Sequence, residues 1–236
     1  MSKEIAIISD IHGNYQALDA IIKDIKKRNI KDIICLGDTI ALGPSSRECL
    51  DLIIKEKIPM LLGNHEMYHI CGHDIDGTFG FFKTRHHKWI NKILKDDYKE
   101  YLNECKLEKK IKLCGKSISF QHFIFENKNK NPFYPVDIID SDKIKDIVSN
   151  LEDDIVIVGH DHHKKTIEYN NKKLVVVGSS GCVTDDNTFY TILSDKNNRV
   201  NIDKIDIKYD RNQFKKIYFK TRFPNYLLYN YMFYKL

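Results

Sequence analysis

Short apolar runs and amphipathic segments alternate along the first sixty residues of the chain. The apolar runs cover residues 5–8, 33–36 and 59–62. The segments between them, residues 16–27 and 47–57, carry apolar side chains at the spacing of one helical face. Buried strands that are joined by helices form parallel sheets with right-handed crossovers. The opening of the chain therefore predicts an α/β fold built on a parallel sheet.

The second half of the chain is richer in patterns that are typical of antiparallel strands. Strands are expected at residues 109–113, 117–122, 155–158, 165–169, 174–177, 189–193 and 200–207, with a helix at residues 141–151. Turn signals at Asn170-Asn171 and at residues 196–198 favour hairpins between neighbouring strands. We therefore expect a four-layer sandwich in which two mixed β-sheets are flanked by helices.

One domain is expected to occupy residues 1–208, a length that suits a single large α/β unit. Within it, residues 67–107 are polar and aromatic and show few strand signals. Helical patches at residues 81–93 and 98–105 predict a small helical insertion beside the functional site. The walls of the substrate site are expected here and at residues 127–137, and neither stretch has a pattern that identifies substrate-binding residues.

The C-terminal segment, residues 209–236, differs in composition from the rest of the chain. It holds ten aromatic residues and six lysines or arginines against one acidic residue, Asp210. The chain has a formal net charge of +5, but residues 1–208 hold equal numbers of basic and acidic side chains, so a basic nucleic-acid-binding body is not indicated. Because so many exposed aromatics would form a very large apolar patch, we expect the segment to pack on the body or on a second subunit. Binding of nucleic acid or of a membrane surface is the alternative.

The cysteines and the start of the chain indicate a reducing compartment. The six cysteines form no Cys-x-x-Cys pair, which disfavours a zinc knuckle. The chain opens with MSKEIAIISD, which has no basic segment followed by a long apolar stretch, and no apolar run is long enough to span a membrane. A cytoplasmic location is the expectation.

Polar motifs occur at five places, four of them directly after apolar runs. The motifs are Asp10-Ile11-His12, Gly37-Asp38, Gly63-Asn64-His65-Glu66, His122 and Gly159-His160-Asp161-His162. In an extended segment, side chains at positions i and i+2 point to the same side, so an Asp-x-His or His-x-His pair can meet one cation. In parallel α/β folds, ligands gather at the carboxyl ends of strands. Each motif alone is compatible with a polar turn, and only their joint occurrence indicates a site.

Together the motifs supply the ligand set for two divalent metal ions that share one bridging carboxylate. Such a pair activates water and neutralises a phosphate, so the sequence indicates a metal-dependent phosphoesterase. His86 and His87 are alternatives to His122 as the histidine of the site. We favour His122, because the end of a strand fixes the position of its side chain. Glu66 is expected to hold the imidazole of His65 and to favour its protonated form.

The order of the five motifs resembles that of the calcineurin-like metallophosphoesterase superfamily, over about residues 4 to 194. The stretches SDIHGNYQAL and GDTIALGP are similar to those of its bacterial phosphodiesterase-type branch. The resemblance implies that Asp10, His12 and His162 hold one metal, that Asn64, His122 and His160 hold the other, and that Asp38 bridges them. It also implies that His65 protonates the leaving oxygen, with Glu66 behind it.

The resemblance further implies a small phosphoester or nucleotide as the substrate and two divalent transition-metal ions as cofactors. Mixed imidazole and carboxylate ligands suit Mn, Fe, Zn, Co or Ni, and the resemblance favours Mn. A protein serine/threonine phosphatase is disfavoured, because the Asp38 motif lacks the Asp-Arg pair of those enzymes. A non-catalytic metal-binding scaffold of the same fold is the other alternative, and the complete ligand set with His65 speaks against it.

Overall fold

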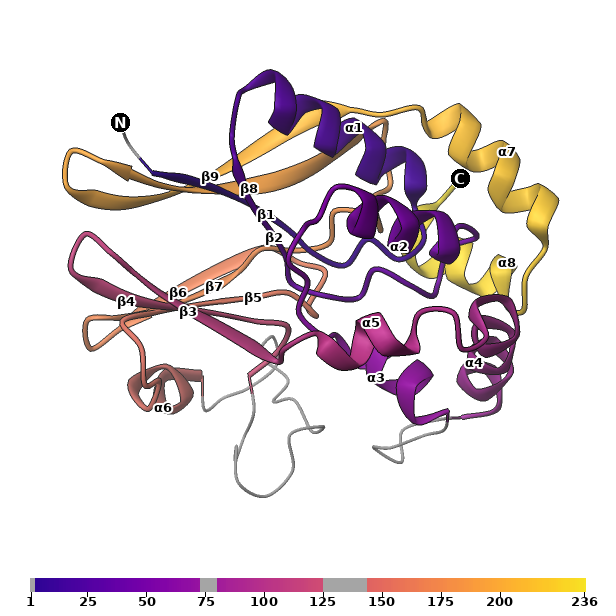
Figure 1. Ribbon diagram of the computed structural model, residues 1–236, viewed down its shortest axis with the longest axis horizontal. Helices are drawn as coiled ribbons and strands as arrows, with labels where there is room; N and C mark the ends of the chain where they lie inside the picture. Colours follow the sequence, from indigo (N-terminus) through magenta and orange to yellow (C-terminus); the bar gives the residue numbers. More distant parts are fainter. Residues whose placement is uncertain (1–2, 73–79, 125–143) are drawn as a thin grey trace.

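Two β-sheets face one another in the computed structural model of the protein, which describes residues 3–72, 80–124 and 144–236 (Figure 1). The first sheet has the strand order β2-β1-β8-β9. Its strands are β1 (Glu4–Ile8), β2 (Asp32–Cys35), β8 (Asn187–Lys196) and β9 (Arg199–Lys208). Strand β1 pairs with β2 in parallel and with β8 in antiparallel, so this sheet is mixed.

The second sheet is mixed as well, with the order β3-β4-β5-β7-β6. Its strands are β3 (Glu108–Leu113), β4 (Lys116–Gln121), β5 (Ile155–Val158), β6 (Lys165–Tyr169) and β7 (Lys172–Val176). The central strand β5 pairs in parallel with β4 and β7, whereas β3 and β6 add antiparallel edges. The hairpin connections of both sheets lie together at the left in Figure 1.

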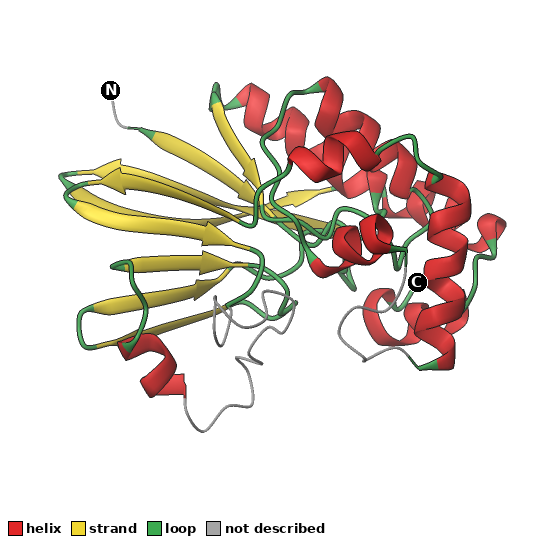
Figure 2. Cartoon of the chain, turned by 60° about the horizontal axis from the view of Figure 1, so that its bottom comes forward, coloured by secondary structure: helices red, strands yellow, loops and turns green. Residues whose placement is uncertain are grey.

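Helices cover the sheets and gather beyond the opposite end of the strands. They are α1 (Tyr15–Lys27), α2 (Ser46–Lys55), α3 (Asn64–Cys71), α4 (Phe81–Leu94), α5 (Lys99–Glu104), α6 (Ile144–Ser149), α7 (Arg211–Thr221) and α8 (Tyr226–Tyr229), followed by the π-helical turn η1 (Asn230–Tyr234). Figure 2 shows α6 alone beside the second sheet, whereas the other helices lie towards the far end of the strands. In the described parts of the chain, every helix is too short or too polar to cross a bilayer.

Three apolar cores separate the four layers, because alternate residues of a buried strand face opposite sides. In β1, Ala6 and Ile8 face the core under α1 and α2, whereas Ile5 and Ile7 face the core between the sheets. Strand β5 alternates in the same way between this inner core and a third core under α6. The predicted α/β sandwich of two mixed sheets flanked by helices is therefore confirmed.

The strand predicted at residues 59–62 is reduced to two bridging residues. Met60 and Leu61 each form a single bridge to a neighbouring segment, and no ladder extends from them. Pro59 has no amide hydrogen to donate to a ladder, and α3 begins only three residues after Leu61. The extended segment is therefore too short to become a full strand.

The region predicted as a helical insertion is largely helical in its described residues. The patches expected at residues 81–93 and 98–105 correspond to α4 and α5, and α3 begins inside the polar motif at Asn64. The helix expected at residues 141–151 is described in part as α6. The loop expected at residues 127–137 lies outside the described residues.

The C-terminal segment packs on the body through its aromatic side chains. Six of its ten aromatics are buried, namely Tyr209, Phe214, Tyr218, Phe223, Tyr229 and Tyr234. They share a core with Ala17 of α1 and Leu42 of the loop after β2. The Tyr234 hydroxyl also donates a hydrogen bond to the backbone oxygen of His12, at 3.0 Å. This hydrogen bond links the C-terminal segment to the polar motif that follows β1.

A buried imidazole links this segment to α4 and to the loop after β2. In His86, Nε2 accepts the backbone N–H of Leu42 at 2.9 Å, and Nδ1 donates to the backbone oxygen of Pro224 at 3.2 Å. These partners require the neutral ring with its proton on Nδ1. Burial lowers the pKa of His86 to about 4.

Acid is expected to weaken the fold through His86. The unfolded chain takes up this proton near pH 6.5 and the folded chain near pH 4, so the stability is present above pH 6.5 and is lost as the pH falls towards 4. The full loss from this group is about 3 kcal/mol. Urea unfolding of the wild type and His86→Gln should show their difference in unfolding free energy shrinking by this amount across that range. A difference that stays constant with pH would contradict the assignment.

Candidate metal centre

Polar side chains from four loops and one helix meet at the carboxyl ends of the strands. Asp10 and His12 follow β1, Asp38 follows β2, His122 follows β4, His160 and His162 follow β5, and Asn64 opens α3. Strands β1 and β2 belong to the first sheet and β4 and β5 to the second, so the site lies where the two sheets meet. All seven side chains predicted as metal ligands come together here.

Four of these residues have a left-handed backbone, which is costly for a residue that carries a side chain. The φ angle is 52° at Asp10, 49° at His12, 51° at Asp38 and 66° at His160. Such angles are uncommon outside glycine and cluster where function demands a fixed geometry. The left-handed backbone at these four residues therefore fixes the directions of their side chains.

Three side chains form the first group of donors. The Nε2 atoms of His12 and His162 are 3.0 Å apart and lie 3.8 and 3.7 Å from Asp10 Oδ1. His12 Nδ1 donates to the backbone oxygen of Ile40 at 3.1 Å, so in the neutral ring Nε2 carries the free electron pair. Asp10 and His12 are buried, whereas the His162 side chain is 19% exposed and marks the opening of the site.

The second group of donors is built around Asp38, His122 and His160. One donor atom from each lies within 4.8 Å of the others. The side-chain oxygen of Asn64 is 3.0 Å from His160 Nδ1. His122 Nδ1 donates to the backbone oxygen of Leu36 at 3.0 Å, which again leaves Nε2 as the free nitrogen of the neutral ring.

Asp38 joins the two groups through one oxygen. Its Oδ2 lies 3.2 Å from His122 Nε2 and 3.8 Å from His12 Nε2. Its Oδ1 accepts the backbone N–H of His65 at 2.9 Å, which fixes the orientation of the carboxylate. One carboxylate oxygen between two sets of donors is the arrangement that a bridge between two cations requires.

The site concentrates negative charge in a buried volume. Asp10, Asp38 and Glu66 are buried, and in the described parts of the chain no lysine or arginine lies within ion-pair distance of them. Burial raises the pKa of Asp10 to about 7. Burial also acts to raise the pKa of Asp38, but the neighbouring imidazoles, with His122 the strongest among them, outweigh it and hold that pKa well below its usual range. Buried carboxylates with only imidazoles beside them favour the binding of cations.

One atom of the first group tests whether the residues fit a metal ion. Asp10 Oδ1 is buried and has no hydrogen-bond partner among the described residues. Leaving a buried polar atom unsatisfied costs about 1–3 kcal/mol, so such atoms normally have a partner. A cation between Asp10, His12 and His162 would supply it, and the mixture of imidazole, carboxylate and amide donors suits divalent transition metals. The residues present therefore fit a pair of such ions.

Glu66 has partners other than the one that the resemblance implies. Its carboxylate accepts, at 2.8 to 3.2 Å, the backbone N–H groups of Asp38, Thr39, Ile40 and Gly63. Both oxygens are thereby used to hold the loop after β2 against the first turn of α3. The predicted place of Glu66 behind the His65 ring is taken by another residue.

The partner of His65 is His87, a histidine of α4. His65 Nδ1 and His87 Nε2 are 3.0 Å apart, and the two rings are stacked with their centroids 4.9 Å apart. Tyr68 packs edge-on against both rings. Burial lowers the pKa of His65 well below its usual range and that of His87 to about 3, so one neutral ring donates to the other. The sequence suggests His87 only as an alternative metal ligand, since this contact joins two helices and leaves no local pattern.

Gly159 precedes two of the ligands and leaves no room for a side chain. A Cβ at Gly159 would collide with Ser9 Oγ and would stand 2.6 Å from Asp10 Oδ2. The same carboxylate oxygen accepts the Ser9 hydroxyl at 2.5 Å and the backbone N–H of His160 at 3.0 Å. A side chain at this position would therefore turn the Asp10 ligand away from the site.

Gly159→Ala is accordingly expected to weaken metal binding by about 10- to 100-fold, the range found when groups behind a metal ligand are altered. Titration of metal-free protein with Mn²⁺ or Zn²⁺ measures the effect. Gly80→Ala is the control, because a Cβ at Gly80 meets nothing within 4 Å. Equal affinities for the two variants would show that the close approach does not matter.

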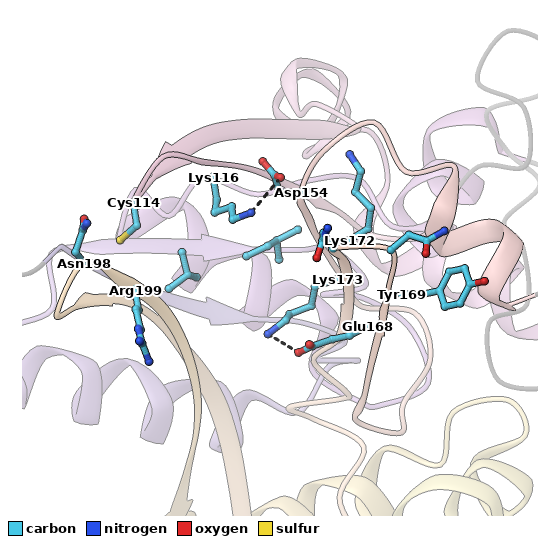
Figure 3. Close-up of a pocket in the computed structure, with 13 residues that line it drawn as sticks. Cys114, Lys116, Asp154, Glu168, Tyr169, Lys172, Lys173, Asn198 and Arg199 are labelled. Carbon is cyan, nitrogen blue, oxygen red and sulfur yellow. Dashed lines mark hydrogen bonds and ion pairs between the residues drawn. The ribbon is translucent and has the colours of Figure 1, made fainter.

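A cavity at the end of the sheets opposite the candidate metal centre is lined by hairpin turns that carry paired charges (Figure 3). This cavity of about 650 Å³ is lined by the turns of the β3–β4, β6–β7 and β8–β9 hairpins. Two of its lysines are neutralised, because Lys116 pairs with Asp154 at 3.4 Å and Lys173 pairs with Glu168 at 2.6 Å. The charged groups in these two pairs are therefore satisfied by one another.

Several other proteins resemble the chain in sequence or in fold. The chain is 29% identical to the uncharacterized protein MJ0912 of Methanocaldococcus jannaschii, over 94% of this chain and 95% of that protein. Hypothetical protein PH1004 from Pyrococcus horikoshii has the same fold, with a TM-score of 0.77, 17% identity and 96% of both chains covered. A metallophosphoesterase from Sphaerobacter thermophilus gives a TM-score of 0.72 and 20% identity, over 95% of this chain and 97% of that one.

A family profile assigns the chain more specifically than these likenesses in fold. The profile of the calcineurin-like phosphoesterases matches residues 3–178. This match spans most of the chain and includes all seven residues that are predicted as metal ligands. The chain therefore belongs to the calcineurin-like phosphoesterase family.

Proposed function

We propose that this phosphoesterase hydrolyses a small phosphoester or nucleotide with two divalent metal ions. The ions would be held by Asp10, His12 and His162 on one side and by Asn64, His122 and His160 on the other, with Asp38 shared. The observation that carries the proposal is the position of Asp38 Oδ2, 3.8 Å from His12 Nε2 and 3.2 Å from His122 Nε2. When bound, two such ions activate a water molecule and neutralise phosphate oxygens.

His65 is proposed as the group that takes up a proton at Nε2 and passes it to the leaving oxygen. His87 occupies its Nδ1, so Nε2 is the nitrogen available to a substrate. The His65 ring lies 5.2 Å from the His12 ring, and donor atoms of His65, His12 and Asp38 lie within 4.8 Å of one another. A phosphoester held at the donors would thus be within reach of His65 Nε2. In this arrangement His87 positions the acid, and Glu66 positions the loop that carries Asp38.

An aromatic side chain at the rim of the site favours a substrate that carries a flat or apolar group. The ring of Phe233, in η1, lies 5.3 Å from the ring of His162 at the opening. Aromatic side chains make favourable contacts with other flat rings, including nucleobases. A nucleotide or an aryl phosphoester suits such a rim better than a bare phosphate.

A metal-dependent assay tests the proposal. Metal-free protein would be loaded with Mn, Fe, Zn, Co or Ni in turn and given bis-(p-nitrophenyl) phosphate or p-nitrophenyl phosphate. We expect turnover only after metal is added, and a metal content that approaches two ions per chain. Absence of turnover with every metal would overturn the proposal in favour of the scaffold alternative. A screen of nucleotides against the most active metal form would then define the substrate.

A further inference from the structure

Cys182 lies in the loop between β7 and β8, beside the first group of donors. The backbone of this loop is tied to the end of β1, because the N–H of Gly181 donates to the backbone oxygen of Asp10 at 3.1 Å. The Cys182 N–H donates to Ser179 Oγ at 2.8 Å, and the Ser179 hydroxyl itself donates to the same Asp10 oxygen at 2.7 Å. These hydrogen bonds therefore fix the backbone position of Cys182.

The sulfur of Cys182 faces the donors of the first group. Its Sγ and one ring nitrogen each of His12 and His162 lie within 4.8 Å of one another. The Nε2 atoms of the two histidines are 3.0 Å apart and lie 3.8 and 3.7 Å from Asp10 Oδ1. That carboxylate oxygen is buried and has no hydrogen-bond partner among the described residues. Besides the cysteine, the group thus contains a buried acceptor that lies close to the same two imidazoles.

We propose that Cys182 is an additional ligand of the metal ion held by Asp10, His12 and His162. The inference rests on the proposed metal-dependent function, because it requires an ion at this position. On coordination the S–H bond breaks, the proton passes to solvent and a sulfur–metal bond forms, as for other thiol ligands. This half of the centre then has two imidazoles, the carboxylate of Asp10, the shared carboxylate of Asp38 and one thiolate.

The spacing of the donors suits an ion with the bond lengths of zinc. With zinc–nitrogen bonds of about 2.0 Å and zinc–sulfur bonds of about 2.3 Å, the donors of a tetrahedral zinc site lie roughly 3.5 Å apart. The separations among Asp10 Oδ1 and the two Nε2 atoms, 3.0 to 3.8 Å, bracket this value. The Cys182 sulfur lies within 4.8 Å of one nitrogen of each imidazole.

A thiolate ligand would make the two halves of the centre prefer different metals. Thiolate and imidazole ligands select zinc and similar ions, whereas oxygen ligands suit manganese and magnesium. The second group contains the amide oxygen of Asn64, and the donor clusters around Asp38 include no cysteine among the described residues. We therefore expect zinc, iron or cobalt in the first half, where the family resemblance alone favours manganese.

Cobalt spectroscopy tests for the sulfur–metal bond without relying on activity. Metal-free protein would be titrated with Co²⁺ under anaerobic conditions while the near-ultraviolet absorption is recorded. A thiolate-to-cobalt charge-transfer band should appear in the wild type and be absent from Cys182→Ser and Cys182→Ala. Cys114→Ser is the matched control, because Cys114 is also partly buried but lines the distant cavity of Figure 3.

Two further measurements distinguish a failure of the Cys182 proposal from a failure of the proposed function. X-ray absorption of the zinc-loaded wild type should show a sulfur neighbour at about 2.3 Å, which requires no variant to fold. The preference for Zn²⁺ over Mn²⁺ should fall at least about 10-fold in Cys182→Ser and stay unchanged in Cys114→Ser. A wild type that binds two ions and hydrolyses phosphoesters but shows only nitrogen and oxygen neighbours would overturn the Cys182 proposal alone. A wild type that takes up no transition metal would overturn the proposed function as well.

Discussion

Asp38→Asn is expected to lower kcat/KM for bis-(p-nitrophenyl) phosphate on the order of 10³-fold and to reduce the metal content of the protein. The amide keeps the oxygen that accepts the His65 N–H at 2.9 Å. It replaces Oδ2, the atom between His12 and His122, by an NH₂ group that cannot bridge cations. Because a bound ion contributes several kcal/mol of charge stabilisation and each 1.36 kcal/mol is a factor of ten, the loss of one ion accounts for this effect.

Metal analysis and steady-state kinetics on the same preparations measure the Asp38 effect. Asp203→Asn, an exposed position on β9, is the matched control for the change of charge. Circular dichroism shows whether the fold is intact, which we expect because the isosteric amide preserves the hydrogen bond to the first turn of α3. An Asp38→Asn protein with two ions per chain and wild-type turnover would refute the bridging role.

His65→Ala is expected to affect substrates according to their leaving group. General acid catalysis typically contributes about 10²- to 10⁴-fold, and it matters most when the departing alkoxide is a strong base. Alkyl phosphodiesters should therefore lose activity within that range. p-Nitrophenyl esters should lose only a few-fold, because p-nitrophenolate leaves without a proton. The measurement is kcat/KM across a series of esters that differ in leaving-group pKa.

Substitution of His87 provides an internal check on this assignment. His87→Ala removes the group that holds His65 Nδ1 at 3.0 Å, so it should produce a smaller loss with the same dependence on the leaving group. Lys88→Ala, an exposed neighbour on α4, serves as its control. If His65→Ala and His87→Ala slowed alkyl and aryl esters equally, the acid role would have to be abandoned.

The fold was predictable from the sequence where local patterns and tertiary structure agree. The β-branched runs at β1, β2 and β5 are largely buried on both faces, so their apolar character is continuous and their identification is simple. The polar motifs after these strands mark their carboxyl ends, whereas the roles of the seven predicted donors, including Asn64 and His122, came from the family resemblance. The segment around Met60 was less predictable, since Pro59 and the early start of α3 limit its pairing to single bridges.

The roles of supporting residues were not predictable, because they depend on contacts between distant segments. Glu66 lies next to His65 in the sequence, yet its carboxylate accepts the backbone amides of the loop after β2. The contact between His87 and His65 joins two helices. Cys182 lies close to His12 although 170 positions separate them in the sequence. No periodicity or spacing encodes such pairings. Only the three-dimensional arrangement separates a ring that binds a cation from one that orients its neighbour.

Each of the two groups of donors draws side chains from both β-sheets. In the first group His12 follows a strand of one sheet and His162 a strand of the other, and Asp38 and His122 have the same relation in the second. A bound ion would act as a cross-link between the halves of the sandwich. Chelation should then lower the melting temperature, since a ligand at a hundred times its dissociation constant adds about 2.7 kcal/mol. Starvation for metal would thus make the protein more susceptible to unfolding and proteolysis as well as inactive.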